Sequence, residues 1–177
     1  MTGGRSRTLP PLAAEDHVCA TCPMAFSAVS VEEARALIAS LPARYRRRLE
    51  DLPAAGLRGR PEPAVWSPLE YLAHVRDVYV TTTIRLYRTR TEDTPALEPM
   101  LNDLRAARFR YDDLDPVALL DELVVTVAGC LEESRHFAAG EWERTATRLP
   151  TERRSARWLL RNAAHEGLHH LRDLGAA

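Results

Sequence analysis

Apolar residues recur at steps of three and four along four stretches of the 177-residue chain, and this is the period of an amphipathic α-helix. The first stretch follows the capping box "SVEE" at Ser30 and should end near Leu52, with Pro42 expected to bend or reset the helix. The second follows "WSPLE", where Ser67 is the predicted N-cap, and should end near Arg90.

The third and fourth stretches also have clear starts. Asp115 is the predicted N-cap of the third helix, ahead of a proline, and Gly140 is the residue expected to close it. The fourth helix should run from Ser155 to about Leu174, and a short helix is expected around Leu101–Phe109. The segments rich in Val and Thr, "VYVTTTI" and "LVVTVAG", lie inside these longer patterns and are assigned to helices.

Four long helices without a predicted strand indicate an all-α four-helix bundle with one long connection. The segment "EWERTATRLPTERR" is expected to be a loop. Residues 1–29 begin with Gly, Pro and Arg in no regular period, so we expect a flexible N-terminal arm that carries a C-x-x-C motif. The bundle domain should occupy residues 30–177.

Composition mainly excludes function classes. The net charge of −1 gives no reason to expect a nucleic-acid or membrane partner, and no apolar run is long enough to span a bilayer. No signal peptide is apparent, so we expect a cytoplasmic protein. The chain contains no Lys, which excludes P-loop phosphoryl transfer and Schiff-base chemistry.

The motif "HEGLH" carries the first candidate chemistry. It places His165 and His169 on one face of the fourth helix, about 6 Å apart along the axis, where two imidazoles can reach one metal ion. His170 points about 100° away from His169 and is left out of the predicted set. An isolated pair of this kind is more often a solvated helix face. The motif also matches zinc proteases, but neither a downstream ligand nor a strand to hold a peptide is present, so this reading is disfavoured.

A third ligand would turn this pair into a metal site. His74 is the candidate, because a bundle that brings the second and fourth helices together would place it beside His165 and His169. If His74 is considered alone, the simpler interpretation is a core histidine that makes one hydrogen bond. Three protein ligands with an open position are typical of a catalytic metal site.

Two carboxylates are candidate catalytic groups. Glu166 neighbours a predicted ligand and could act as a general base, although it fits a solvated helix residue equally well. Asp77 lies one turn after His74 and could orient an imidazole. Its alternative is a surface salt bridge with Arg76 or Arg172.

The N-terminal stretch "HVCATC" is a second constellation. Cys19 and Cys22, with His17 as a candidate partner, could form a redox pair or part of a second metal site, or could simply lie in a turn. Cys130 lies among apolar residues in mid-helix and is expected to be a buried structural thiol.

The stretches "VWSPLEYLAHVRDV" (65–78) and "SARWLLRNAAHEGLHHLRDL" (155–174) together resemble the DinB-like, or DinB/YfiT-like, metalloenzyme superfamily. This superfamily includes bacillithiol transferases and the N-terminal domain of mycothiol-dependent maleylpyruvate isomerase. The resemblance implies up-down-down-up topology, a divalent metal on His74, His165 and His169, and a homodimer. It also implies a low-molecular-weight thiol as co-substrate.

The sequence therefore favours a metal-dependent enzyme that activates a mycothiol-type thiol, or water, against a small electrophilic substrate, as a transferase, hydrolase or isomerase. Zn²⁺ is the first expectation for the metal, with Ni²⁺ and Fe²⁺ as alternatives, since imidazole suits all three. The competing hypothesis is a helical module that binds a metal or small molecule without catalysis.

Overall fold

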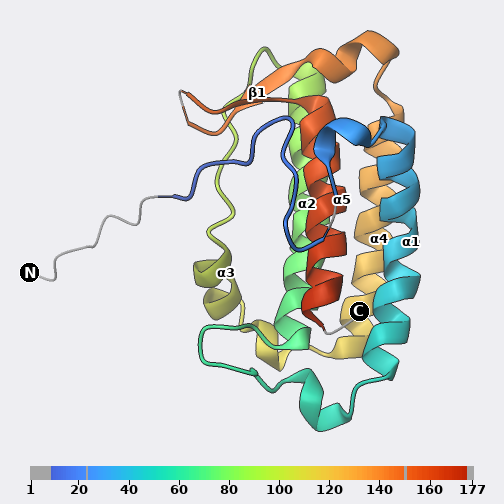
Figure 1. Ribbon diagram of the computed structural model, residues 1–177, viewed down its shortest axis with the longest axis vertical. Coiled ribbons are helices and arrows are strands. Elements are labelled where there is room, and N and C mark those ends of the chain that lie inside the picture. Colours follow the sequence, from blue (N-terminus) through green and yellow to red (C-terminus); the bar gives the residue numbers. More distant parts are fainter. Residues whose placement is uncertain (1–8, 23, 150, 175–177) are drawn as a thin grey trace, which may run out of the picture.

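Four long helices form the molecule, as the sequence predicts (Figure 1). The computed structural model describes residues 9–22, 24–149 and 151–174. The long helices are α1 (Val31–Glu50), α2 (Pro68–Thr91), α4 (Pro116–Arg135) and α5 (Ala156–Asp173), and α3 (Asn102–Arg108) is a short helix between them. Short 3-10 turns are η1 (Phe26–Ala28), η2 (Ala54–Leu57), η3 (Tyr111–Asp113) and η4 (Ala139–Glu143).

The helix starts follow from local chemistry. Ser30 and Ser67 each accept a hydrogen bond from the backbone of the third helical residue in a complete capping box, and Asp115 and Ser155 cap α4 and α5 with their side chains. Pro42 does not reset α1, which continues through it. The fully buried side chains on either side of this proline pack into the core, and this packing outweighs the lost backbone hydrogen bond.

The end of α4 differs from the prediction. The helix stops at Arg135 with His136 as its C-cap, and Gly140 lies beyond it in η4. Phe137 and Trp142 stack at 4.5 Å between ring centroids just after the helix. This aromatic pair lies where the sequence predicted a further turn of α4.

The order of the helices around the bundle brings distant segments together. α2 packs against α4 and α5, and α1 packs against the same two helices from the other side. In Figure 1, α1 and α5 run downward whereas α2 and α4 run upward. The two middle helices therefore run parallel to each other and antiparallel to the first and last, which is the up-down-down-up topology. The connection over residues 92–115 returns along the outside of the bundle, which lets α2 and α4 run parallel. As a result, the "HEGLH" helix lies directly beside α2.

A two-stranded sheet covers one end of the bundle, where the sequence predicted a loop. β1 (Thr145–Thr147) pairs antiparallel with β2 (Arg153–Ser155), and Ala96 adds a parallel bridge to Thr147. Strands of three residues are too short to show an alternating pattern. None of the helices in the described ranges is both long and apolar enough to cross a membrane.

Part of the N-terminal segment packs against the bundle. Residues 1–8 lie outside the described part, but the segment from residue 9 onward runs beside α5 and joins α1 (Figure 1). The indole nitrogen of Trp158 donates to the carbonyl of Ala14 at 3.0 Å, and Ser155 donates through its backbone N–H and its hydroxyl to Glu15. Phe26 is completely buried. These contacts attach the C-x-x-C motif to the helix that carries "HEGLH".

Candidate metal centre

Helix α5 presents ligand side chains on two different faces. Among the described residues, three groups that include them have ligand atoms all within 4.8 Å of one another, and one of these, His169, His170 and Asp173, takes a histidine from each of the other two. Of those two, one group combines His74 with Glu166 and His170, and we call it the α2–α5 cluster. The other combines His165 and His169 with the two N-terminal cysteines, Cys19 and Cys22, and we call it the cysteine cluster.

One carboxylate oxygen is the centre of the α2–α5 cluster. The Nε2 atoms of His74 and His170 each lie 3.3 Å from the same Oε2 atom of Glu166. Burial raises the pKa of Glu166, but the hydrogen bonds from His170 and His74 outweigh it and hold this pKa well below its usual range. Burial lowers the pKa of His170, but its bonds to Asp173 and Glu166 raise it to about 9.

Neighbouring side chains fix both imidazoles of this cluster. His170 Nδ1 lies 2.7 Å from Asp173 Oδ2, which orients the ring and leaves Nε2 facing Glu166. Tyr71 stacks on the His170 ring with 5.0 Å between centroids, and Trp66 contacts the His74 ring edge-on at 5.2 Å. The three ligand groups are therefore held in place by the fold itself.

A cavity of about 360 Å³ adjoins the α2–α5 cluster. Trp66 and Asp173, which contact the two histidines of the cluster, both line it, together with Arg60 from the α1–α2 connection. This volume suits a small-molecule substrate.

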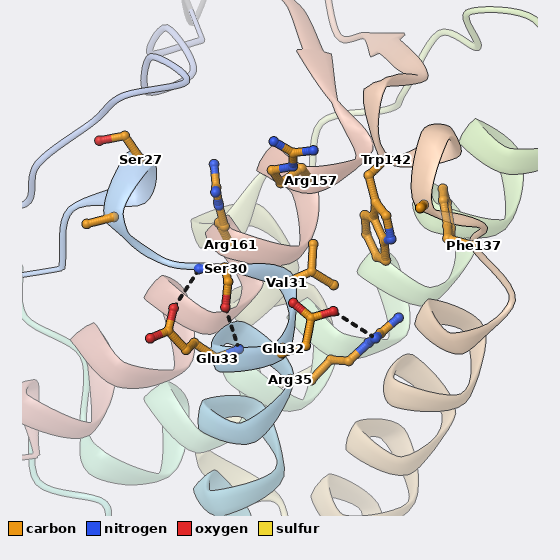
Figure 2. Close-up of a pocket in the computed structure, with 12 residues that line it drawn as sticks. Ser27, Ser30, Val31, Glu32, Glu33, Arg35, Phe137, Trp142, Arg157 and Arg161 are labelled. Atoms are coloured by element: carbon orange, nitrogen blue, oxygen red, sulfur yellow. Dashed lines mark hydrogen bonds and ion pairs between the residues drawn. The ribbon is translucent and has the colours of Figure 1, made fainter.

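A larger cavity of about 620 Å³ lies at the N-terminal end of α1 and contains no member of either cluster (Figure 2). Its basic groups already have partners. Arg35 donates to the hydroxyl and carbonyl oxygens of Ser134, and Arg161 donates to the carbonyl of Val29. The smaller cavity is the nearer of the two to the α2–α5 cluster, because Trp66 and Asp173, which line it, contact His74 and His170.

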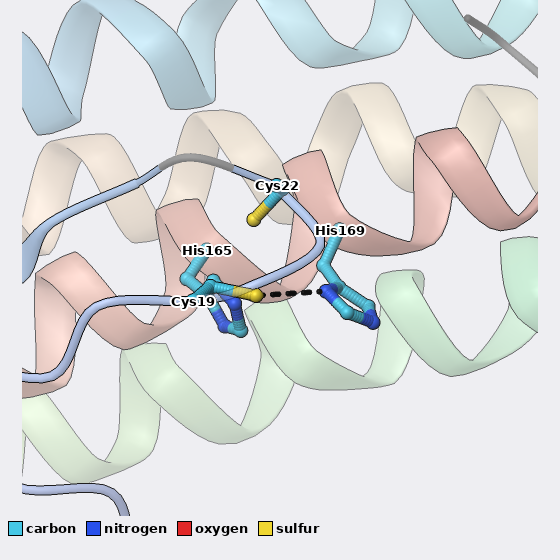
Figure 3. A group of neighbouring side chains, drawn as sticks. All are labelled: Cys19, Cys22, His165 and His169. Carbon is cyan, nitrogen blue, oxygen red and sulfur yellow. Dashed lines mark hydrogen bonds between the residues drawn. The ribbon is translucent and has the colours of Figure 1, made fainter.

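The cysteine cluster lies on the outer face of α5. Figure 3 shows the two thiols and two imidazoles directed toward a common point, with Cys19 Sγ 3.5 Å from His169 Nδ1. Burial raises the pKa of Cys19, but hydrogen bonds from the backbone of Cys22 and Thr21 and from His169 bring it to about 6. Burial and the neighbouring Cys19 raise the pKa of Cys22 to about 11. One thiolate, the form that binds metal, is thus already favoured.

Asp77 anchors the long connection rather than the histidines. It is almost fully buried, and its Oδ2 accepts hydrogen bonds from the Tyr111 hydroxyl at 2.5 Å and from Arg105 Nε. Its Oδ1 lies 2.6 Å from Arg76 Nε, so the predicted pair with Arg76 is present but buried. The carboxylate thereby holds α3 and η3 against α2.

We expect Asp77→Asn to lower the free energy of unfolding by about 1–3 kcal/mol, because buried donors lose a charged acceptor. Metal content should not change. Denaturant titration and elemental analysis measure both quantities, and Asp121→Asn is the control, since Asp121 is an exposed aspartate paired with Arg46. Loss of metal at unchanged stability would instead place Asp77 in the site.

The structure divides the predicted three-histidine set between the two clusters. His165 and His169 lie together, but His74 lies with Glu166 and with His170, which is not part of the predicted set. His17 contacts the His165 ring edge-on at 5.9 Å and does not belong to the cysteine cluster. The reason is geometric: adjacent positions on a helix face about 100° apart, so only one of the two pairs on α5 faces α2.

Comparisons with known proteins agree with the fold. The family model of the DinB superfamily matches residues 29–174. One similar solved structure is YfiT from Bacillus subtilis, described as a probable metal-dependent hydrolase with an unusual four-helix bundle topology. Its TM-score is 0.76 at 17% identity, over 82% of this chain and 83% of that chain.

A mycothiol-dependent maleylpyruvate isomerase is also similar, with a TM-score of 0.69 at 22% identity. The match covers 87% of this chain but only 64% of the isomerase. A histidine-to-alanine mutant of that isomerase gives a TM-score of 0.69 at 21% identity. A search of curated proteins found none that matches. At these identities the likenesses show the fold.

Proposed function

The chain belongs to the DinB superfamily, and we propose that within it this protein is an enzyme whose divalent metal ion is held by His74, Glu166 and His170. The observation that carries the proposal is the single Glu166 oxygen at 3.3 Å from both histidine Nε2 atoms. We propose this set in place of the three histidines predicted from the sequence, since the ligand atoms of His165 and His169 group with the cysteines and not with His74.

The donor atoms fit a divalent metal. Ligand bonds of 2.0–2.2 Å in tetrahedral geometry put neighbouring donor atoms about 3.3–3.6 Å apart, and the two nitrogen-to-oxygen separations of 3.3 Å in the cluster agree with this. Two His and one Glu form a known catalytic zinc set. The contact between His170 Nδ1 and Asp173 is the outer-shell carboxylate that such ligands typically have.

Three protein ligands leave room for an exogenous one. A divalent metal held in this way lowers the pKa of a water or thiol that it binds. The chain's own residues supply the rest. Trp66 contacts the His74 ring, Tyr71 stacks on the His170 ring, and Asp173 keeps His170 oriented. The cavity beside the cluster, which Trp66 and Asp173 line, is the place that we propose for a small substrate.

For the reaction, we propose transfer of a low-molecular-weight thiol of the mycothiol type to a small electrophile, with zinc as the metal. The similarity to a mycothiol-dependent isomerase supports the thiol. Hydrolysis is the second candidate, favoured by the similarity to a probable metal-dependent hydrolase. Omitting the thiol from the assay distinguishes the two. The homodimer and the cytoplasmic location remain predictions.

We expect His74→Ala to lose one equivalent of metal per chain and to lower kcat/KM by more than about 100-fold, which is the upper range for losing an outer-shell partner. Elemental analysis of the purified chain and a thiol-dependent conjugation assay provide the two measurements. His136→Ala is the matched control, because His136 is an exposed histidine at the end of α4.

Unchanged metal content and activity in His74→Ala would contradict the proposed site. Loss of metal from a protein that shows neither conjugation nor hydrolysis would favour the non-catalytic binding module.

A further inference from the structure

The proposed enzyme site leaves the cysteine cluster without a role. We infer that Cys19, Cys22, His165 and His169 bind a second, structural zinc ion, which fastens the N-terminal segment to α5. This inference concerns different ligands from the proposed catalytic site and does not depend on the enzyme's reaction.

The ligand types and their spacing match a structural zinc site. Cys19 and Cys22 form C-x2-C, and His165 and His169 form H-x3-H, which are the spacings found in Cys2His2 sites. Zinc bonds of about 2.3 Å to sulfur and 2.0–2.1 Å to nitrogen separate neighbouring donor atoms by about 3.3–3.8 Å. The four donors lie within 4.8 Å of one another, and Cys19 Sγ is already 3.5 Å from His169 Nδ1. Small movements would therefore complete a tetrahedron.

The backbone shapes the N-terminal segment for this purpose. An antiparallel bridge between Val18 and Ala25 closes a turn that contains both cysteines. Cys19 N–H donates to the carbonyl of Met24 at 3.1 Å. Both thiols are buried in the turn and face α5 (Figure 3).

The two histidines have features that a metal ion explains. His165 Nε2 is buried and has no hydrogen-bond partner among the described residues, which is unusual for a polar atom in a folded protein. His169 directs Nδ1 to Cys19, and its Nε2 lies 3.8 Å from Asp173 Oδ2 on the far side of the ring. A ligand histidine typically has a carboxylate on its second nitrogen.

Zinc accounts for the cluster better than a redox pair does. Reactive C-x-x-C thiols are partly exposed and typically lie at a helix N-terminus, whereas Cys19 is 8% exposed, Cys22 is fully buried, and both precede η1 and α1 in a turn. A redox pair would also leave two imidazoles against the thiols without a purpose. Two thiolates neutralise Zn²⁺, so the buried site would carry no net charge. Four protein ligands close the site, as structural zinc requires.

Asp173 links this site to the proposed catalytic cluster. Its Oδ2 lies 2.7 Å from His170 Nδ1 and 3.8 Å from His169 Nε2, so one carboxylate contacts a ligand of each metal. A zinc ion on the outer face of α5 would thus help to hold Glu166 and His170 toward α2.

Cobalt substitution tests the inference, because Co²⁺ bound to thiolate gives a sulfur-to-metal charge-transfer band. We expect the full chain loaded with Co²⁺ to show this band. Cys19→Ser and Cys22→Ser should abolish it and lose one metal equivalent. Cys130→Ala, which alters the third and equally buried cysteine on α4, should keep it. His74→Ala should also keep the band, which separates this site from the catalytic one.

A measurement on the unmodified chain tests the inference even if the cysteine variants fail to fold. Removing zinc with a chelator should expose Cys19 and Cys22 to alkylation, and restoring zinc should protect them again. The inference is overturned if the unmodified chain shows no thiolate–cobalt band, if the band survives in Cys22→Ser, or if zinc does not alter alkylation.

Discussion

Glu166→Gln is expected to remove the catalytic metal and to lower kcat/KM by at least about 100-fold, while the chain stays folded. The substitution keeps the size of the side chain but replaces the carboxylate whose Oε2 lies 3.3 Å from both His74 and His170. A neutral amide oxygen is a weaker ligand and no longer balances the charge of the ion. Elemental analysis, circular dichroism and the thiol-dependent assay measure the three effects.

The same variant separates two roles for Glu166. A general base would be needed for proton transfer only, so its loss would reduce the rate by about 10²–10⁴-fold and leave the metal in place. If Glu166 is a metal ligand, the variant loses both the metal and the activity. Glu132→Gln is the matched control, because Glu132 is an exposed helical glutamate on α4. Full metal content in an inactive Glu166→Gln would restore the general base considered from the sequence and remove Glu166 from the ligand set.

The bundle was predictable because its signals are local. Each long helix begins with a side-chain cap that the sequence shows directly, and the long connection after α2 is visible there as well. Features that depend on tertiary packing were not visible. The continuation of α1 through Pro42 and the short β1–β2 pair both depend on contacts that local patterns do not encode.

The rotation of α5 was the decisive feature for the site. Its buried stripe centres near Gly167 and Leu171. At about 100° per residue, His165 and His169 lie roughly opposite this stripe, on the outer face. They could not reach α2 from there.

Glu166 and His170 lie at the edge of the stripe, next to α2. The sequence contained this signal, because the apolar positions of the helix define which side faces the core. The H-E-x-x-H pattern, however, matches a zinc motif in which the two histidines are the ligands, so it favoured His165 and His169. The cysteines could not be placed at all from the sequence, since their partners on α5 follow more than a hundred residues later.

Gly167→Ala is expected to destabilise the protein by about 1–3 kcal/mol, although alanine normally favours a helix over glycine by about 1 kcal/mol. A Cβ at this position would lie 2.5 Å from the Tyr79 hydroxyl oxygen and closer still to Leu41 Cδ1. Both side chains are fully buried, and the Tyr79 hydroxyl donates to the Ala163 carbonyl at 3.1 Å. Neither group can move aside cheaply, so α5 must shift away from α1 and α2.

This shift should reach the catalytic cluster, because Gly167 is flanked by Glu166 and lies one turn from His170. A displacement of about 1 Å can reduce catalysis by about 100-fold, so kcat/KM should fall together with the unfolding midpoint. Gly129→Ala is the matched control. Gly129 is also inside a helix but is exposed, and a Cβ there meets nothing within 4 Å, so this variant should gain stability and keep full activity. Equal gains in both variants, measured by denaturant titration, would mean that α5 does not pack as closely against α1 and α2 as the structure shows.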